Sequence, residues 1–117
     1  MESNLEIYQQ EKPWGNFRKF TNNLPSTVKI ITINPNSKLS LQSHTKRSEF
    51  WKVVKGSGFF EINGERKAVS LGDESFASVG IKHRMESGFN GMQVLEISIG
   101  DFDEEDITRY EDDYGRI

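Results

Sequence analysis

At 117 residues the chain is long enough for one domain with one hydrophobic core, and it contains no cysteine. Disulfide bonds and thiolate chemistry are therefore excluded. Charged residues make up 28% of the chain, the mean hydropathy is −0.65, and no apolar run approaches the ~20 residues of a membrane-spanning helix. Because residues 1–4 also lack the basic and apolar regions of a signal peptide, we expect a cytoplasmic protein and no membrane partner.

Opposite charges are concentrated in different parts of the chain. Residues 101–117 hold eight acids and two arginines, whereas residues 1–100 hold ten acids and thirteen bases. Several of these bases lie within residues 38–55 and 82–84, beside the candidate site residues described below. A basic rim around a pocket suits a small anionic substrate such as a sugar phosphate, although ordinary solubilising charge explains any single lysine equally well. The acidic balance, without a basic stripe interleaved with aromatic residues, argues against nucleic acid as a partner.

Short strands separated by turns are predicted for most of the chain. Residues 1–11 are expected to be a weakly ordered lead-in, and Pro13 marks a turn after which a strand begins near Phe17. Residues 38–51 predict a strand, a short loop and the start of a second strand. Further strands are predicted over residues 28–33, 50–55, 59–62, 65–69, 75–79, 83–86 and 92–99.

Turn and helix signals complete the predicted architecture. Asn63-Gly64 is the strongest short hairpin signal, and Gly56-Ser57-Gly58 predicts a tight turn. Residues 103–111 predict a short helix, because an acidic first turn precedes Ile107 and Tyr110. Many short strands with glycine-rich turns predict an all-β sandwich or barrel. With no internal repeat or linker, residues 1–117 are expected to form one domain that ends in this C-terminal helix.

Polar side chains share one face of the strand predicted after Lys38. Side chains alternate in an extended chain, so Ser40, Gln42 and His44 point one way. If Glu49 opens the next strand facing inward, an amide oxygen, an imidazole and a carboxylate meet at one point. Such groups suit a borderline divalent metal, and His83, the second of two histidines in the chain, could supply a fourth ligand.

Each of these residues also has a simpler interpretation. A single histidine in a β-domain is more often a hydrogen-bonded core residue than a metal ligand. Gln42 alone would be a strand polar residue, and Glu49 could instead form a surface ion pair with Arg47 or Lys52. The acidic tail, residues 101–117, could be a solvated helix and coil, or it could fold back and carry Arg116 to the pocket.

Two motifs in the chain resemble those of the cupin superfamily. His44-x-Lys46-x-x-Glu49, followed after six residues by Gly56, resembles the first motif, within residues 36–56. Gly72 followed by Gly80-x-x-His83 resembles the second motif, within residues 72–87. Four positions depart from the common pattern: Lys46 replaces a second histidine, Ser78 a proline, Ser87 an asparagine and Asn36 a turn glycine.

A narrower resemblance covers the chain from about Pro13 to Arg116. The chain is similar to the C-terminal isomerase domain of type II phosphomannose isomerases, which are often fused to a GDP-mannose pyrophosphorylase. Because these 117 residues hold no nucleotidyltransferase part, the resemblance implies the isomerase activity alone. The matching motifs are Pro13-Trp14-Gly15, Lys38-Leu39-Ser40-Leu41-Gln42-x-His44-x-x-Arg47-x-Glu49-x-Trp51, Val53-Val54-x-Gly56, Gly80-x-x-His83-Arg84, Asp106-Ile107-x-Arg109 and Asp112-Asp113-Tyr114-Gly115-Arg116.

The resemblance implies a cupin β-barrel or jelly roll and assigns residues to roles. It implies that Gln42, His44, Glu49 and His83 bind a divalent metal, with zinc first and manganese, cobalt, iron or nickel as alternatives. It also implies that Ser40, Arg47, Arg84 and Arg116 contact the substrate or take part in catalysis. A homodimer is compatible with the resemblance.

The implied reaction interconverts mannose 6-phosphate and fructose 6-phosphate through an enediol. Arg84 or Arg116 would stabilise the enediolate. Arg47 would bind the 6-phosphate, with Lys38 or Lys46 as point charges and Ser40 as a hydroxyl donor. The proton carrier stays open between hydroxide at the metal, Lys38 and an acid such as Asp112. The alternatives are a cupin epimerase or ketoisomerase acting on a nucleotide-linked sugar, and a non-catalytic module that binds a sugar or a metal.

Overall fold

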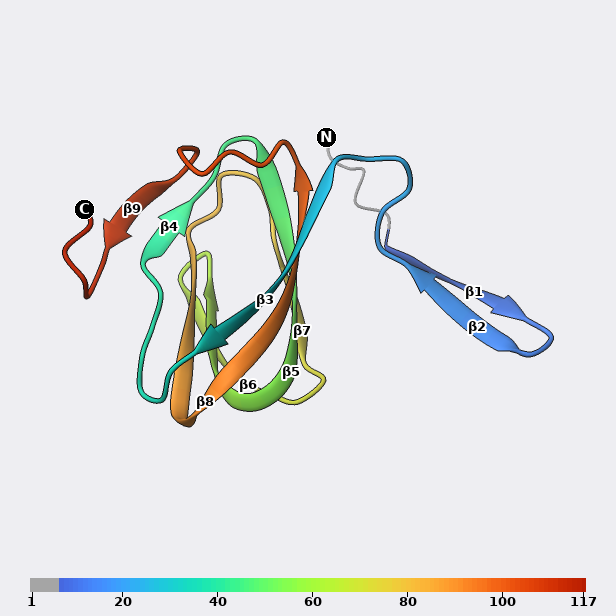
Figure 1. The fold of residues 1–117 in the computed structure, drawn as a ribbon, viewed down its shortest axis with the longest axis horizontal. Coiled ribbons are helices and arrows are strands. Elements are labelled where there is room, and N and C mark those ends of the chain that lie inside the picture. The colour runs from blue at the N-terminus through green and yellow to red at the C-terminus, as the bar shows by residue number, and fades with distance from the viewer. Residues whose placement is uncertain (1–6) are drawn as a thin grey trace.

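The computed structural model describes residues 7–117, which form nine β-strands and no helix (Figure 1). The described part of the chain therefore contains no helix that is long and apolar enough to cross a membrane. The strands are β1 (Tyr8–Lys12), β2 (Gly15–Lys19), β3 (Ser26–Ile33), β4 (Leu41–Ser43), β5 (Arg47–Ile62), β6 (Glu65–Ser70), β7 (Glu74–Ala77), β8 (His83–Gly100) and β9 (Thr108–Glu111).

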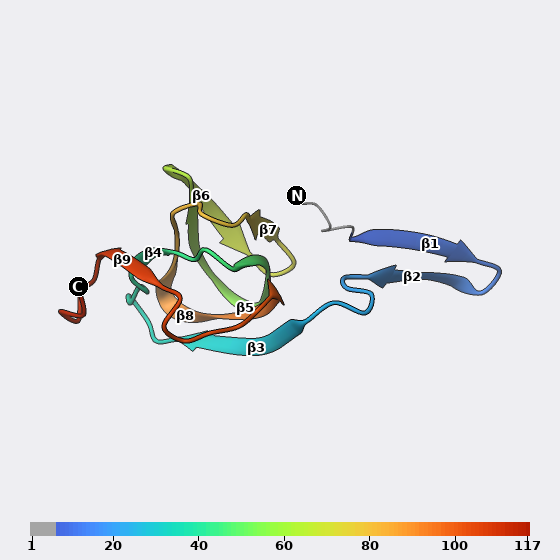
Figure 2. The same cartoon turned by 90° about the horizontal axis from the view of Figure 1, so that it is seen from above.

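Two long bent strands, β5 and β8, build the barrel. The first part of β5 and the last part of β8 pair with each other and form one sheet, in the order β7-β5-β8-β3. Their other parts form a second sheet, in the order β6-β5-β8-β4-β9. Figure 2 shows that the strands of both sheets enclose one interior. The predicted all-β barrel is confirmed.

Glycines allow β5 to bend where a tight turn was expected. Instead of ending at Gly56-Ser57-Gly58, β5 continues through these residues with irregular pairing on both sides of Gly56. Gly56 has φ of 76°, and a Cβ at Gly56 or Gly58 would collide with the backbone of β8. The two strands predicted over residues 83–86 and 92–99 are likewise one continuous strand, β8.

The predicted hairpin around Asn63-Gly64 is present between β5 and β6. Asn63 has φ of 53° and Gly64 has φ of 82°, so both residues adopt the left-handed conformation that a type I′ turn requires. Here a local signal was sufficient, because the turn chemistry depends on two neighbouring residues alone.

The helix predicted for residues 103–111 is wrong. Residues 108–111 form β9, which pairs with β4 through Gln42–Arg109 and Ser43–Thr108. The acidic residues that suggested a helix N-terminus have another function. The carboxylates of Asp103 and Asp106 accept hydrogen bonds from backbone N–H groups within loops. Pairing with a strand distant in sequence therefore overrides the local pattern.

An N-terminal hairpin, formed by β1 and β2, projects beyond the barrel in both ribbon views (Figures 1 and 2). The turn expected at Pro13 and the strand near Phe17 are confirmed. The weakly ordered lead-in expected for residues 1–11 is wrong for residues 8–11, which belong to β1, while residues 1–6 lie outside the described residues.

Two apolar clusters lie on opposite faces of the sheet β7-β5-β8-β3. The first fills the barrel interior, where the Trp51 and Phe60 rings meet edge to face with centroids 4.9 Å apart. The second lies outside, where Phe20 packs against Phe50. The interior cluster consists of Ile33, Trp51, Val53, Phe60, Val69, Ala77, Met85, Met92 and Val94.

Phe60→Ala should destabilise the fold strongly, because Phe60 is 1% exposed and its removal leaves a cavity beside Trp51. We expect a loss of about 3–5 kcal/mol in the free energy of unfolding, measured by denaturant titration. Phe89→Ala is the matched control, since Phe89 is 77% exposed and its loss should change stability by no more than about 0.5 kcal/mol. Equal losses in both variants would contradict this assignment of the core.

Candidate metal centre

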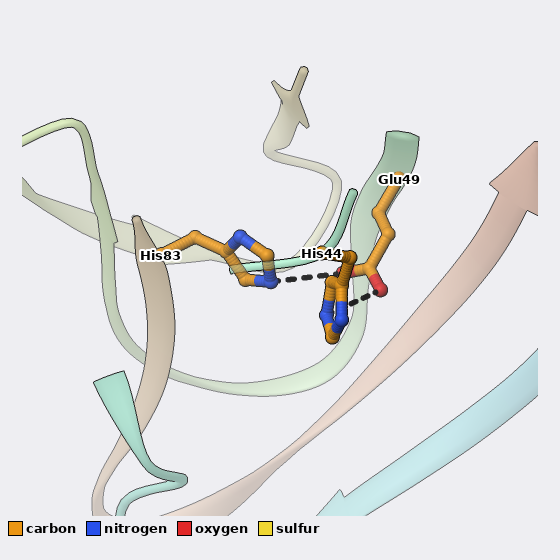
Figure 3. A group of neighbouring side chains, drawn as sticks. All are labelled: His44, Glu49 and His83. Carbon is orange, nitrogen blue, oxygen red and sulfur yellow. Dashed lines mark ion pairs between the residues drawn. The ribbon is translucent and has the colours of Figure 1, made fainter. Parts of the chain in front are cut away.

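Three elements bring His44, Glu49 and His83 together inside the barrel (Figure 3). His44 follows β4, Glu49 is the third residue of β5, and His83 opens β8. Gln42 of β4 pairs in register with His83, which sets both on the same side of the second sheet. Glu49 and Trp51 alternate with Phe50, which faces outward, so the Glu49 carboxylate points to the interior.

Ligand-type atoms of this His–Glu–His cluster are close to one another. Nε2 of His44 lies 3.3 Å from Oε2 of Glu49, and Nε2 of His83 lies 3.3 Å from Oε1 of Glu49. One such atom from each residue lies within 4.8 Å of the others. The three side chains are between 1% and 4% exposed, so the cluster is enclosed.

Hydrogen bonds to backbone carbonyl groups determine which ring nitrogen of His44 and of His83 carries the proton. Nδ1 of His44 lies 2.7 Å from the carbonyl oxygen of Asp106, and Nδ1 of His83 lies 3.0 Å from that of Ile81. A carbonyl oxygen only accepts hydrogen bonds, so each neutral ring carries its proton on Nδ1 and keeps a lone pair on Nε2. Nε2 of His83 is buried without any hydrogen-bond partner. This arrangement is typical of histidines that bind metals through Nε2.

Gln42 and Ser40 extend the cluster along β4 and the residues before it. The Ser40 hydroxyl donates to Oε1 of Gln42 at 2.6 Å, and Nε2 of Gln42 lies 3.2 Å from Nε2 of His44. Rotating this amide by 180° would direct its oxygen toward the cluster, and the Ser40 hydroxyl could then accept a hydrogen bond instead of donating one. Gln42 is therefore placed where a fourth ligand is needed.

The protonation states of the cluster suit a cation. Burial lowers the pKa of His44, although the Asp106 carbonyl and Glu49 oppose this effect, so the ring is neutral near pH 7. Burial alone would raise the pKa of Glu49, but contacts with His83 and a hydrogen bond with Glu96 outweigh it and hold this pKa below its usual value. Burial, followed by the charge of Glu49, raises the pKa of Glu96 to about 8. The centre thus combines the Glu49 carboxylate with the neutral His44 imidazole.

Arg47 lies at this centre rather than on the surface. Its side chain is 6% exposed, its Nε donates to Oε2 of Glu49 at 3.1 Å, and its Nη2 lies 3.3 Å from Nε2 of His44. Nη1 donates to the carbonyl oxygen of Asp103, and the guanidinium lies 4.3 Å from the centroid of the Phe102 ring. The guanidinium that was expected at the substrate's phosphate therefore contacts the candidate metal ligands.

The C-terminal segment holds the loop that carries His44. Besides the carbonyl contact to His44, Asp106 accepts hydrogen bonds from the backbone N–H and the hydroxyl of Thr45 at 2.9 and 2.7 Å, and from the Lys46 N–H at 2.9 Å. These bonds, with those from Thr45 foremost, lower the pKa of Asp106 to about 2. Hydrogen bonds thereby join residues sixty or more positions apart in the chain.

Other predicted residues lie away from the cluster. Arg84, on the side of β8 opposite His83, donates to the carbonyl oxygen of Leu39 and to Glu111. Nζ of Lys46 lies 3.8 Å from a carboxylate oxygen of Asp103.

Two further predicted residues, Lys38 and Arg116, line one surface cleft of about 280 Å³. The Arg116 guanidinium also forms a two-point contact with Asp112, at 2.8 Å for both hydrogen bonds. Lys38 pairs with Glu86, which lies on the side of β8 opposite His83, so Lys38 faces away from the cluster and the cleft lies on the outer side of the barrel.

Two residues of the centre received no role from the sequence alone. Glu96 is 5% exposed and faces the interior beside Glu49. A single acid within the apolar run of residues 92–99 is the signal that could have revealed it. Asp106 belongs to the matching motif Asp106-Ile107-x-Arg109, but its role could not be assigned, because its contacts with Thr45 and Lys46 depend on how the tail folds back.

The donor set fits a divalent first-row metal. Two imidazole Nε2 atoms, one buried carboxylate and a neighbouring side-chain amide match the ligand types that such ions take in proteins. Nε2 of His83 faces the Glu49 carboxylate at 3.3 Å and has no other hydrogen-bond partner, so a cation held between them would satisfy both groups.

Comparison with solved structures identifies the fold as a cupin. A cupin protein from Bacteroides fragilis aligns with a TM-score of 0.60 at 18% identity, over 90% of this chain and 86% of that chain. KdgF from Halomonas sp. aligns with a TM-score of 0.62 at 18% identity, over 87% of this chain and 94% of that chain. At this identity the likeness shows the fold alone.

The family follows from sequence comparison. The chain belongs to the family described as "Mannose-6-phosphate isomerase C-terminal", whose model matches residues 2–112. Mannose-1-phosphate guanylyltransferase ManC of Salmonella typhimurium is 34% identical over 96% of this chain and 23% of its own length. Alginate biosynthesis protein AlgA of Pseudomonas putida is 31% identical over 98% of this chain and 24% of its own length. The chain thus spans about a quarter of the length of these relatives, and the resemblance inferred from its motifs is confirmed.

Asp106→Ala should weaken metal binding about 10- to 100-fold, because the loop that orients His44 loses three hydrogen bonds. The dissociation constant is measured by competition with a chromophoric chelator, for zinc and for manganese. Asp112→Ala is the matched control, since Asp112 holds Arg116 in the same tail. A variant that melts earlier but binds metal as the wild type does would contradict a role for Asp106 in orienting His44.

Proposed function

We propose that this chain is a metal-dependent isomerase that interconverts mannose 6-phosphate and fructose 6-phosphate, with zinc, manganese, cobalt, iron or nickel as the metal. The observation that carries the proposal is the enclosed cluster of His44, Glu49 and His83, with both Nε2 lone pairs directed at the carboxylate. Membership in a family described by mannose-6-phosphate isomerase supports the choice of substrate. The cytoplasmic location stays a prediction.

In this proposal His44, Glu49, His83 and the amide oxygen of Gln42 hold the metal. When bound, the ion supplies Lewis acidity that polarises the oxygens on C1 and C2 of the sugar. The reaction removes a proton from one of these carbons and returns a proton to the other through an enediolate, so no redox partner is needed. The two Nδ1 hydrogen bonds to Asp106 and Ile81 keep the imidazoles in the ligating orientation throughout.

Arg47 is the arginine that the geometry favours at the reacting end of the sugar. Its guanidinium already contacts Glu49 and His44 in a site that excludes water, where a fixed positive charge stabilises an enediolate best. Arg84 is held by Leu39 and Glu111 on the other side of β8. Any effect of Arg84 on the reaction would therefore be indirect, through the position of β4. Its Nη2 is buried and has no hydrogen-bond partner.

The 6-phosphate is proposed to bind at the cleft that contains Lys38 and Arg116. Lys38 bridges to Glu86 on the side of β8 opposite His83, so a sugar bound at this cleft would have to extend around Leu39 and Ser40 to reach the cluster. Arg116 would have to release Asp112 to reach the phosphate, and Lys46 would have to release Asp103. Binding this remote dianion would position the sugar for reaction.

His44→Ala should abolish isomerase activity, because it removes one proposed metal ligand. The full chain is stripped with a chelator and reloaded with each metal, and fructose 6-phosphate is measured by a coupled assay with phosphoglucose isomerase and glucose-6-phosphate dehydrogenase. A Lewis acid worth several kcal/mol corresponds to a loss of about a thousandfold or more.

Glu65→Gln is the control for this experiment, since Glu65 lies on β6 and its side chain is exposed. Metal-loaded wild-type protein that does not turn over mannose 6-phosphate would overturn the isomerase proposal. Turnover of a nucleotide-linked sugar alone would favour the epimerase or ketoisomerase alternative. Stabilisation by ligand without turnover of any sugar would favour a binding module.

Lys38→Ala should raise the KM for mannose 6-phosphate about tenfold while changing kcat less, because a phosphate contact contributes binding in both the ground state and the transition state. Steady-state kinetics with mannose 6-phosphate and with unphosphorylated mannose measure the effect, and mannose should show none. Lys55→Ala is the control, since Lys55 is an exposed lysine of β5. An unchanged KM, or an equal effect on mannose, would remove Lys38 from the phosphate site.

A further inference from the structure

Two further buried polar atoms have no hydrogen-bond partner among residues 7–117. They are Oγ of Ser98, a fully buried residue, and Nε of Arg109. Buried polar groups in folded proteins are almost always paired, so each unpaired group needs a specific explanation. Both residues lie beside proposed metal ligands, as the register of the strands shows.

Ser98 faces the barrel interior next to Glu49. In β8 it lies between Ile97 and Ile99, which pack in the outer apolar cluster, so its own side chain points inward. It pairs directly with Glu49 of β5 and with Thr27 of β3. Side chains that pair across neighbouring strands have Cβ atoms about 5 Å apart. A hydroxyl group that can both donate and accept a hydrogen bond therefore adjoins the proposed ligand carboxylate.

Arg109 faces the barrel interior next to Gln42. It pairs directly with Gln42 of β4, which in turn pairs with His83 of β8. The next residue, Tyr110, points to the other side of β9, where its hydroxyl lies 3.0 Å from Oγ of Ser43. Arg109 is therefore the next member of the inner row that runs from His83 through Gln42.

The charge of Arg109 is also unpaired within the part of the chain that the structure describes. The other five arginines each have a carboxylate oxygen at 2.7–3.3 Å, in the pairs Arg18–Glu74, Arg47–Glu49, Arg66–Glu86, Arg84–Glu111 and Arg116–Asp112. A guanidinium group carries five N–H donors in one plane and accepts no hydrogen bond. Arg109 thus keeps a planar set of donors available beside Gln42.

Ser98 and Arg109 lie on the same side of the proposed metal centre. Because β5 and β8 run through both sheets, the direction from β5 to β8 is common to the two sheets. In this direction one sheet continues to β3, and the other continues to β4 and β9. Among the nine strands β3 pairs with β8 alone and β9 with β4 alone, so no backbone ladder closes the barrel between them. The two residues therefore extend the site from both sheets toward this opening.

We infer that Ser98 and Arg109 bind the hydroxyl groups on C3 and C4 of the sugar, the carbons next to the reacting pair. The inference rests on the proposed function, because it takes C1 and C2 of an open-chain phosphosugar to lie at the metal. The planar donors of Arg109 match two adjacent hydroxyl oxygens, and Ser98 can donate to or accept from one hydroxyl group. Each contact would give a partner to a buried group that otherwise has none.

The first test measures kcat/KM of the full chain with mannose 6-phosphate and with its 3-deoxy and 4-deoxy analogues. A site that binds a hydroxyl group penalises an analogue that lacks it, and a variant without the donor does not. Against at least one analogue, discrimination should fall about 10- to 100-fold in Arg109→Met and about 3- to 10-fold in Ser98→Ala. Arg109→Lys should resemble Arg109→Met, since lysine keeps the charge but not the planar set of donors.

Matched controls exist for both residues. Arg66→Met removes an arginine of β6 whose side chain is 50% exposed. Ser48→Ala removes a serine that is 5% exposed and adjacent to Glu49 in sequence, but that pairs with Ile99 on the outer face. Both control variants should discriminate against the deoxy analogues as the wild type does.

The second test separates this inference from the isomerase proposal. Sorbitol 6-phosphate has no carbonyl group and cannot isomerise, so its binding to the zinc-loaded chain is measured by calorimetry, with inorganic phosphate as the reference. The wild type should bind it more tightly than phosphate. Arg109→Met and Ser98→Ala should weaken only sorbitol 6-phosphate, about 10- to 100-fold and 3- to 10-fold. This pattern in a chain without turnover would remove the isomerase proposal and keep the hydroxyl-binding site.

Thermal unfolding distinguishes ligand binding from a structural role of Ser98. Ser98→Ala should leave the midpoint of the metal-free protein unchanged or raise it, because the hydroxyl that it removes makes no hydrogen bond. A lower midpoint would overturn the role of Ser98. Unchanged discrimination in Arg109→Met, or equal weakening of inorganic phosphate, would overturn the role of Arg109. A wild type that binds sorbitol 6-phosphate no more tightly than phosphate would overturn both.

Discussion

The pairing of β5 with β8 is the constraint on which the rest of the structure depends. Both strands are long, and both bend where Gly56 and Gly58 approach the backbone of β8, so one ladder belongs to two sheets. The first part of β5 directs Glu49 inward, and the first residue of β8 is His83. The same ladder therefore closes the barrel and sets a carboxylate beside an imidazole.

Hydrogen bonds to backbone carbonyl groups determine which tautomer each neutral histidine of the centre adopts. The His44 and His83 rings each donate Nδ1–H to a backbone carbonyl, which leaves the lone pair of each neutral ring on Nε2, toward the Glu49 carboxylate. The tail contributes through Asp106, which binds the loop that carries His44. The acidic C-terminal segment thus helps to hold the site in place. Inside the barrel, Arg47 and Glu96 both contact Glu49 and so influence the charge of its carboxyl group.

Family membership and structure support the proposed function at different levels. The family description names mannose-6-phosphate isomerase, and the relatives, of which the chain spans about a quarter, are named as guanylyltransferases or polysaccharide biosynthesis proteins. Cupin structures at 18% identity share the fold alone. The argument for isomerase chemistry consequently depends on the donor set of this chain and on Arg47 beside it.

Local patterns in the sequence were sufficient for the all-β class, the Asn63-Gly64 hairpin and the shared face of Ser40, Gln42 and His44, because alternation and turn chemistry involve neighbouring residues. Spacing and resemblance also selected Glu49 and His83, whose proximity the fold then provides. Only the tertiary structure decided that residues 108–111 are a strand, that Arg47 and Glu96 are buried beside Glu49, and that Asp106 holds the His44 loop. Apart from the contact of Arg47 with Glu49 on the same strand, these features arise from contacts between segments about fifty to seventy residues apart, and no periodicity within a single segment encodes them.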